Sequence, residues 1–223
     1  DRSQLHWPNR GSYHFRQAWS YAPKGIDKAV ETAQMTDFLT TAQALVAEGK
    51  IRAIGVSNES VWGAARWLHL ADTLGLPRMA TVQNEYNLLC RQFDTDWAEL
   101  SVVEDMPLLA FSPLATGLLS GKYAGDVIPE GSRRSLNPDL SGRITAQVFP
   151  AVAAYLGVAA RHGLDPCQMA IAFCRSRPFT TIPIIGATNL DQLRTDIGAA
   201  SVTVSQDELD DIAETHRAFP APY

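Results

Sequence analysis

From residue 35 onward, helix-length amphipathic segments alternate with short apolar runs, and this alternation is the feature that most constrains the fold. It is typical of β/α units, in which helices cover a parallel sheet. Helices are predicted at 35–48, 59–74, 94–105, 144–161, from 166, 189–198 and 205–219, and strands at 4–7, 52–56, 79–83, 108–111 and 181–185. Residues 1–223 are predicted to form a single domain. An open doubly wound sheet and a closed (β/α)8 barrel both fit, because periodicity does not distinguish them.

Local start and stop signals support these helices. Asp165 and Ser205 are predicted N-caps, Asn58 and Asp94 are N-cap candidates, and the predicted C-terminal glycines are Gly49, Gly75 and Gly163. Pro166 takes the first helical position, and Gln168 and Glu208 are placed to complete capping boxes. Residues 116–142, rich in Gly, Ser, Pro and Arg, predict a lid loop instead of an ordinary connection.

Composition and charge restrict the partners. The formal net charge of −5 argues against a nucleic-acid or anionic-membrane surface, which would need a basic face. No apolar run approaches the roughly 20 residues that span a bilayer, so we expect a cytoplasmic protein without a membrane partner. Cys90, Cys167 and Cys174 form no CxxC pair and are expected to be buried small hydrophobes. The chain starts at Asp1, directly on a predicted strand, and we expect a fragment or a processed product.

Polar side chains follow the predicted strands at the point where each strand ends. They are His6, Ser57–Asn58, Gln83–Asn84, Ser112 and Gly186–Thr188. In parallel α/β folds, ligands bind where these ends gather. Amide and hydroxyl groups on one rim suit a planar amide such as nicotinamide. The helix after Gly186–Thr188 offers free N–H groups and a positive dipole end to a phosphate.

Four ordered motifs resemble the aldo-keto reductase superfamily over essentially the whole chain. They are GKIRAIGVSN at 49–58, QNEYN at 83–87, FSPL at 111–114 with GLLSGKY at 117–123, and GAT at 186–188 with Gln192. Within the superfamily the chain is most similar to the branch of bacterial Tas-type reductases and potassium channel β-subunits. The resemblance implies a (β/α)8 TIM barrel, of which this chain would hold about the last five β/α units and the C-terminal helices. It also implies NADP(H) as cofactor and a small carbonyl compound as substrate.

The resemblance implies a role for each matching position. The nicotinamide carboxamide would contact Ser57, Asn58 and Gln83, and the ring would stack on Phe111, where tyrosine or tryptophan is commoner. The pyrophosphate would lie against Ser112, Pro113, Leu114, Gly117, Ser120 and Lys122, with Arg133 closing over the cofactor. The 2′-phosphate region would meet Gly186, Thr188 and Gln192, and adenine would meet Thr195 and Asp196, where the family more often has Glu-Asn.

On the substrate side, His6 resembles the family histidine that orients the carbonyl, and a neutral imidazole can donate a hydrogen bond there. Trp7 is expected to form a wall of the substrate pocket, and simple packing fits it equally well. No metal site is expected, because His14, His69, His162 and His216 show no ligand spacing.

Two interpretations of the function stay open. The family's proton-donating tyrosine, tuned by a lysine and an aspartate, has no counterpart here in an Asp-Thr-Ala or Tyr-Gly context. The chain is either part of an NADPH-dependent carbonyl reductase or a nucleotide-binding, catalytically incomplete sensor or partner protein similar to the channel β-subunits. A homo-oligomer is compatible with both. NADPH is favoured over NADH because a 2′-phosphate needs charge-assisted donors, here Lys122, Arg133, Arg134 and Arg194.

Overall fold

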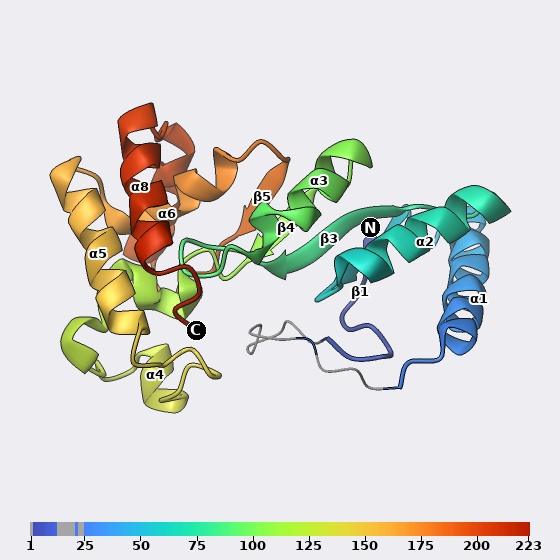
Figure 1. Ribbon diagram of the computed structural model, residues 1–223, viewed down its shortest axis with the longest axis horizontal. Helices are drawn as coiled ribbons and strands as arrows, with labels where there is room; N and C mark the ends of the chain where they lie inside the picture. Colours follow the sequence, from blue (N-terminus) through green and yellow to red (C-terminus); the bar gives the residue numbers. More distant parts are fainter. Residues whose placement is uncertain (1, 13–20, 22–24) are drawn as a thin grey trace. The chain divides into compact units, whose positions relative to one another are not determined.

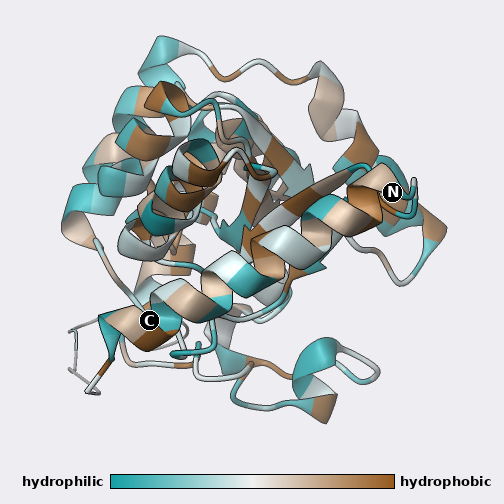
Figure 2. Ribbon diagram, turned by 90° about the vertical axis from the view of Figure 1, so that its right-hand side faces the viewer, coloured by the Kyte–Doolittle hydropathy of each residue, from teal (hydrophilic) through white to brown (hydrophobic). Residues whose placement is uncertain are grey.

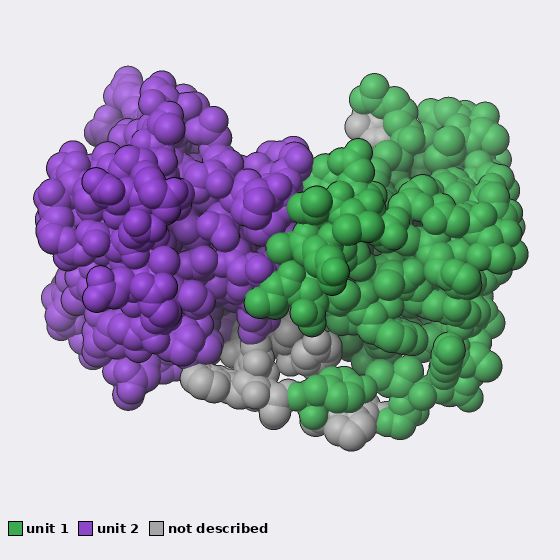
Figure 3. All heavy atoms as spheres, turned by 45° about the horizontal axis from the view of Figure 1, so that its top comes forward, with its two compact units in different colours: residues 1–84, 95–109 green, residues 85–94, 110–223 purple. Residues whose placement is uncertain are grey.

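The computed structural model describes residues 2–12, 21 and 25–223, and His14 lies outside them (Figure 1). The chain divides into two compact units, which Figure 3 colours separately. Unit 1 comprises Asp1–Asn84 and Thr95–Leu109, and unit 2 comprises Glu85–Asp94 and Ala110–Tyr223.

Unit 1 is built on parallel strands covered by helices. Its elements are β1 (Arg2–Leu5), α1 (Lys28–Ala47), β2 (Ala53–Ser57), α2 (Val61–Leu74), nearly all of β3 (Met79–Glu85), α3 (Asp96–Val103) and the start of β4 (Leu108–Phe111). β2 lies between β1 and β3 and pairs with both in parallel. Leu39, Ile54 and Val82 are fully buried, so the core lies between helices and sheet.

Unit 2 is mainly helical and holds the end of β4 together with β5 (Thr181–Ile184). Its helices are α4 (Arg133–Leu136), α5 (Val148–Arg161), α6 (Pro166–Arg175), α7 (Leu190–Gly198) and α8 (Gln206–Ala218), and its 3₁₀ turns are η1 (Gln92–Asp94), η2 (Ala115–Ser120), η3 (Ala124–Asp126) and η4 (Ala199–Ser201). The core centres on Tyr86, whose ring stacks on Phe173 with centroids 6.1 Å apart and meets Phe179 edge-on at 5.7 Å. Such aromatic pairs add to the stabilisation from buried area.

The predicted α/β architecture is confirmed, and each predicted strand overlaps an observed one. The Asp165 carboxylate caps α6 by accepting hydrogen bonds from two backbone N–H groups, and Ser205 with Glu208 forms the predicted capping box of α8. Gln168 forms no capping box. Its amide donates to the carbonyl of Thr195 at 3.2 Å.

Two of the N-cap candidates, Asn58 and Asp94, do not cap a helix. α2 is capped by the Ser60 hydroxyl, which accepts from the Gly63 N–H at 3.2 Å, whereas Asn58 precedes the helix in the left-handed region with φ 51°. Asp94 does not cap α3, because its carboxylate accepts the Tyr86 hydroxyl at 2.5 Å and pairs with Arg91.

Element boundaries differ at two further places. α1 begins at Lys28, seven residues before the predicted start, because Asp27 caps it through the N–H groups of Ala29 and Val30. The helix predicted from 144 begins at Val148. The predicted lid, 116–142, contains two 3₁₀ turns and α4, so it is a structured segment.

Apolar and polar segments alternate along the helices, as expected when one face packs on a core (Figure 2). Among the helices of the described residues, none is both long enough and apolar enough to cross a membrane.

Candidate cofactor site

The ends of β1, β2 and β3 bring four predicted site residues together in unit 1. The strand register pairs Leu5 with Val56 and Ser57 with Gln83, so His6 follows β1 beside the end of β2. The Ser57 hydroxyl donates to the Gln83 carbonyl at 2.7 Å. The Asn58 side-chain amide donates to the His6 carbonyl at 3.0 Å. These contacts tie the three strand ends to one another.

Amide groups at these strand ends keep hydrogen-bonding capacity. The half-buried Gln83 side chain forms no hydrogen bond to the part of the chain that the structure describes. Asn58 uses its NH2 group on His6 and on the Ser57 hydroxyl, which leaves its side-chain carbonyl without a donor from the described residues. A planar primary amide needs one donor and one acceptor, and these side chains can supply both.

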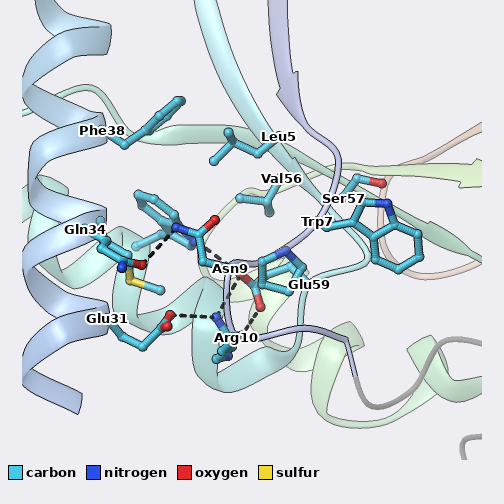
Figure 4. Close-up of a pocket in the computed structure, with 13 residues that line it drawn as sticks. Leu5, Trp7, Asn9, Arg10, Glu31, Gln34, Phe38, Val56, Ser57 and Glu59 are labelled. Atoms are coloured by element: carbon cyan, nitrogen blue, oxygen red, sulfur yellow. Dashed lines mark hydrogen bonds and ion pairs between the residues drawn. The ribbon is translucent and has the colours of Figure 1, made fainter. Parts of the chain in front are cut away.

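His6 and Trp7 lie directly after β1 and are exposed, Trp7 at 41%. Their rings are tilted by 47° with centroids 5.2 Å apart. A cavity of about 110 Å³ opens beside this segment and is lined by Trp7, Ser57 and Phe38 among others (Figure 4). Polar and aromatic side chains thus border a small cavity at the carboxyl ends of β1 and β2.

In unit 2, the chain after β4 makes a turn of left-handed residues. Ser112 has φ 53°, and its carbonyl accepts hydrogen bonds from the Ala115 N–H at 2.8 Å and the Asn87 side chain at 3.0 Å. Thr116 and Gly117 follow with φ 57° and 97°. Pro113 is buried, and Phe111 and Leu114 are half-buried. Backbone in this region is costly for residues other than glycine, and such turns are common where backbone approaches a ligand.

The GLLSGKY segment forms a tight loop around Gly117. The Ser120 hydroxyl donates to the Gly117 carbonyl at 2.7 Å, so it stabilises the loop itself. A Cβ at Gly117 would lie 2.7 Å from Lys122 Cε and 3.0 Å from its ammonium nitrogen. The exposed Lys122 therefore lies across the glycine backbone, as a cation that meets a phosphate on this loop would.

The two arginines of α4 differ in environment. Arg134 is 4% exposed and committed to the loop, because it pairs with the Asp126 carboxylate and donates to the carbonyls of Val127 and Pro138, each at 3.2 Å. Arg133 is exposed and has no side-chain partner in the described part of the chain. Arg194 pairs with Asp191 at 2.9 Å. Of the four basic residues predicted to meet a phosphate, Lys122 and Arg133 have no carboxylate partner among the described residues.

The segment 186–196 presents an exposed helix start. The Thr188 N–H and hydroxyl both donate to the Gln192 side-chain carbonyl, at 2.9 and 3.0 Å, so the Gln192 NH2 group remains available. Gly186 is exposed, with no atom within 4 Å of a Cβ placed there. Thr195 is half-buried. Asp196 is 5% exposed, and burial, with a contribution from nearby Asp165, raises the pKa of its carboxyl.

A buried polar network, which the sequence did not predict, supports the Ser112 turn. Arg143 donates to both Glu85 carboxylate oxygens, at 2.9 and 2.6 Å, and the Tyr223 hydroxyl donates to Glu85 at 3.0 Å. The Asn87 amide, which holds the Ser112 carbonyl, also contacts the Tyr223 hydroxyl at 3.1 Å. Burial and the Glu85 charge raise the pKa of Tyr223 well above its ordinary value, so this phenol stays protonated. Only the QNEYN motif signals the network in the sequence.

The remaining predicted features occupy other places. Cys174 is buried, Cys90 and Cys167 are half-buried, and all three are free thiols. His162 contacts the Asp211 carboxylate at 2.9 Å. Among the described residues, no group of three or more His, Cys, Asp or Glu side chains is arranged to hold a metal ion.

Comparison with known proteins shows the family of the chain. The sequence pattern of the Aldo/keto reductase family matches residues 1–217. The chain belongs to the aldo/keto reductase family.

Particular relatives define its place within the family. The chain is 43% identical to Protein tas of Escherichia coli K12 over all of its own length and 64% of that protein. It is 29% identical to a probable voltage-gated potassium channel subunit beta of Arabidopsis thaliana, over 73% of this chain and 55% of that one. The glycerol dehydrogenase of Gluconobacter oxydans superposes with a TM-score of 0.71 over 99% of this chain and 59% of its own, at 21% identity. These matches confirm the predicted family, branch and barrel fold class. The chain spans about two thirds or less of the length of these proteins.

Proposed function

We propose that the protein containing this chain is an NADPH-dependent oxidoreductase that reduces an aldehyde or ketone to an alcohol. The observation that carries the proposal is the pairing of Ser57 with Gln83 at adjacent strand ends, beside His6, with amide groups left to bind a ligand. Membership of the aldo/keto reductase family supports this assignment.

The residues present suit a nicotinamide cofactor. Ser57, Asn58 and Gln83 would hold the carboxamide by complementary hydrogen bonds. Lys122 and Arg133 would neutralise phosphate charge, since neither is consumed by an internal ion pair among the described residues. NADPH, when bound, supplies the hydride. The His6 imidazole, as a donor, would orient the carbonyl that accepts it.

Turnover tests the proposal. The purified gene product that contains this chain is incubated with NADPH and a panel of reactive aldehydes and quinones, and loss of NADPH absorbance is followed. We expect saturable oxidation, with Gln83→Ala raising the NADPH Kd by about tenfold or more because two hydrogen bonds in a desolvated site are lost. Gln43→Ala, which alters an exposed amide on α1, is the matched control. No turnover by an NADPH-saturated protein would count against the proposal.

The likeness to a channel β-subunit favours a second candidate, a nucleotide-binding partner protein without turnover. It predicts tight NADPH binding, no oxidation with any substrate of the panel, and a co-purifying partner. Absence of nucleotide binding would contradict both candidates.

A further inference from the structure

The segment that follows β1, residues 6–10, is fastened at both ends to the same short stretch before α2. At one end the His6 carbonyl accepts the Asn58 amide at 3.0 Å. At the other end the Arg10 guanidinium pairs with the Glu59 carboxylate and donates to the Ser60 hydroxyl at 3.0 Å. Both contacts therefore involve the consecutive residues 58–60, directly after Ser57, which is predicted to bind the nicotinamide.

Glu59 is a rigid anchor. Its backbone N–H donates to the Asn84 side-chain carbonyl at 3.2 Å, and the Asn84 NH2 group donates back to the Glu59 carbonyl at 3.0 Å. Its carboxylate also accepts the Trp67 indole N–H at 3.2 Å and the Ser60 N–H at 2.7 Å. Because these donors hold the Glu59 carboxylate in place, the carboxylate fixes the position of the Arg10 guanidinium that pairs with it.

The ion pair is buried and has space made for it. The side chains of Arg10 and Glu59 are 7% and 2% exposed, and the guanidinium lies 5.0 Å from the centroid of the Trp62 ring. Gly63, inside α2, is the residue against which the pair packs, since a Cβ there would collide with Arg10 Nη2 and with the Glu59 carboxylate. Glycine is unfavourable in a helix, and here its absent side chain leaves room for the ion pair.

Residues 6–10 are only partly packed. His6 and Trp7 are exposed, and residues 7–10 line the cavity of about 110 Å³ instead of filling it. Figure 4 shows Arg10 between Glu31 and Glu59, with Glu31 3.8 Å from the guanidinium. A segment bordered by a cavity keeps its course through its polar anchors, of which Arg10 is the charged one.

We propose that Arg10, through its ion pair with Glu59, is a positioning residue that holds His6 and Trp7 against the carboxyl end of β2, where the carbonyl substrate would bind. This inference rests on the proposed reductase function. Arg10 acts only through the segment it fastens, because its own guanidinium is consumed by Glu59 and Ser60.

The test separates substrate positioning from cofactor binding. Arg10→Met, Arg10→Lys, Glu59→Gln and Gly63→Ala are made in the gene product that contains this chain, and kcat/KM for a reactive aldehyde is measured beside the NADPH Kd. We expect Arg10→Met to lower kcat/KM by about tenfold to 100-fold, because a displaced orienting group costs that much. The NADPH Kd should stay within about twofold. Arg10→Lys should restore part of the loss.

Gly63→Ala is the sharper variant, because it removes no charge and improves helix propensity, while its Cβ collides with both the Glu59 carboxylate and the Arg10 guanidinium and so disturbs their ion pair. It should reproduce the Arg10→Met loss. Gly157→Ala in α5 is its control, since a Cβ there meets only Arg161 Nη1 at an ordinary 3.8 Å. Arg78→Met is the control for arginine, because Arg78 pairs with Asp72 and Glu104 at the surface of unit 1. Both controls should keep wild-type kcat/KM. The double variant Arg10→Met/Glu59→Gln should lose less than the sum of the single variants.

The proposal that Arg10 positions His6 and Trp7 is overturned if Arg10→Met keeps the wild-type kcat/KM. Where Arg10→Met does not fold, the same result in Gly63→Ala overturns it. A parallel rise in the NADPH Kd also overturns it, because Arg10 then supports the whole unit and not the substrate side. Absence of turnover in the wild type refutes the reductase function first, and the positioning role falls with it. Turnover in the wild type with undiminished turnover in the variants refutes the positioning role alone.

Discussion

The Arg143–Glu85 ion pair under the Ser112 turn gives a quantitative prediction for Arg143→Met. The side chains are 5% and 10% exposed, and the guanidinium makes two hydrogen bonds to the carboxylate. Removing the arginine leaves a buried carboxylate whose remaining donors are the neutral groups of Tyr223 and Asn87. Breaking a buried pair in this way costs about 3–5 kcal/mol.

Equilibrium urea unfolding measures this cost. With an m-value of about 3 kcal/mol/M for a chain of this size, the midpoint should fall by about 1–1.7 M. Glu85→Gln/Arg143→Met should recover most of the loss, because replacing both partners removes the unpaired charge. Arg78→Met, at a pair 40% exposed on the arginine side, should cost about 1 kcal/mol or less. A midpoint shift in Arg143→Met no larger than in Arg78→Met, or a double variant as unstable as the single one, would show that the buried Glu85 charge does not need Arg143.

Three further outcomes follow from local geometry. Gly117→Ala should cost about 1–2 kcal/mol from its positive φ. Its urea midpoint should fall about as far as that of Gly125→Ala, which also has a positive φ, because the end of the exposed Lys122 side chain that a Cβ would meet can move aside; a much larger loss at Gly117 would contradict this. Burial raises the pKa of Cys167 to about 11, so at pH 8 its thiolate should be about 100-fold scarcer than the thiolate of a cysteine with the ordinary pKa. The rate at which a thiol reagent labels Cys167 should rise about tenfold per pH unit, and a rate that stays flat would contradict this. Burial also raises the pKa of Asp196, so the folded state disfavours the charged carboxylate. Asp196→Asn should therefore raise the urea midpoint at pH 7, with a gain that fades as the pH falls toward about 4. An equal gain at both pH values would exclude this cause.

Elements with a local signature could be predicted from the sequence. The capping box of α8 is one, because Ser205 and Glu208 are three residues apart and bond to each other's backbone. The start of α1 could not be found by periodicity, since its buried residues begin only at Met35 and the preceding turns are half-buried or exposed. The sequence could not show that the N-cap candidate Asn58 does not cap α2, because its side chain bonds to His6, 52 residues away.

In the candidate site, too, the residues with a local sequence signature could be predicted, and those that depend on distant contacts could not. Strand-end polarity and family motifs identified His6, Ser57, Asn58 and Gln83, and the structure gathers them in unit 1. The roles of Arg133 and Arg134 could not be distinguished by sequence, because only packing shows that Arg134 is buried in its loop while the Arg133 side chain has no partner among the described residues. The supporting pairs were missed because each joins residues about 50 or more positions apart, a separation that leaves no periodic signal.

A fluorescence titration with NADPH and NADH, on the gene product that contains this chain, tests whether the chain carries the NADPH-binding half of a reductase site. We expect saturable binding of NADPH, about tenfold or more tighter than NADH because Lys122, Arg133 or the 186–192 segment meets the extra phosphate. Absence of saturable NADPH binding would contradict this expectation, and equal affinity for the two nucleotides would contradict the assignment of the phosphate-binding residues.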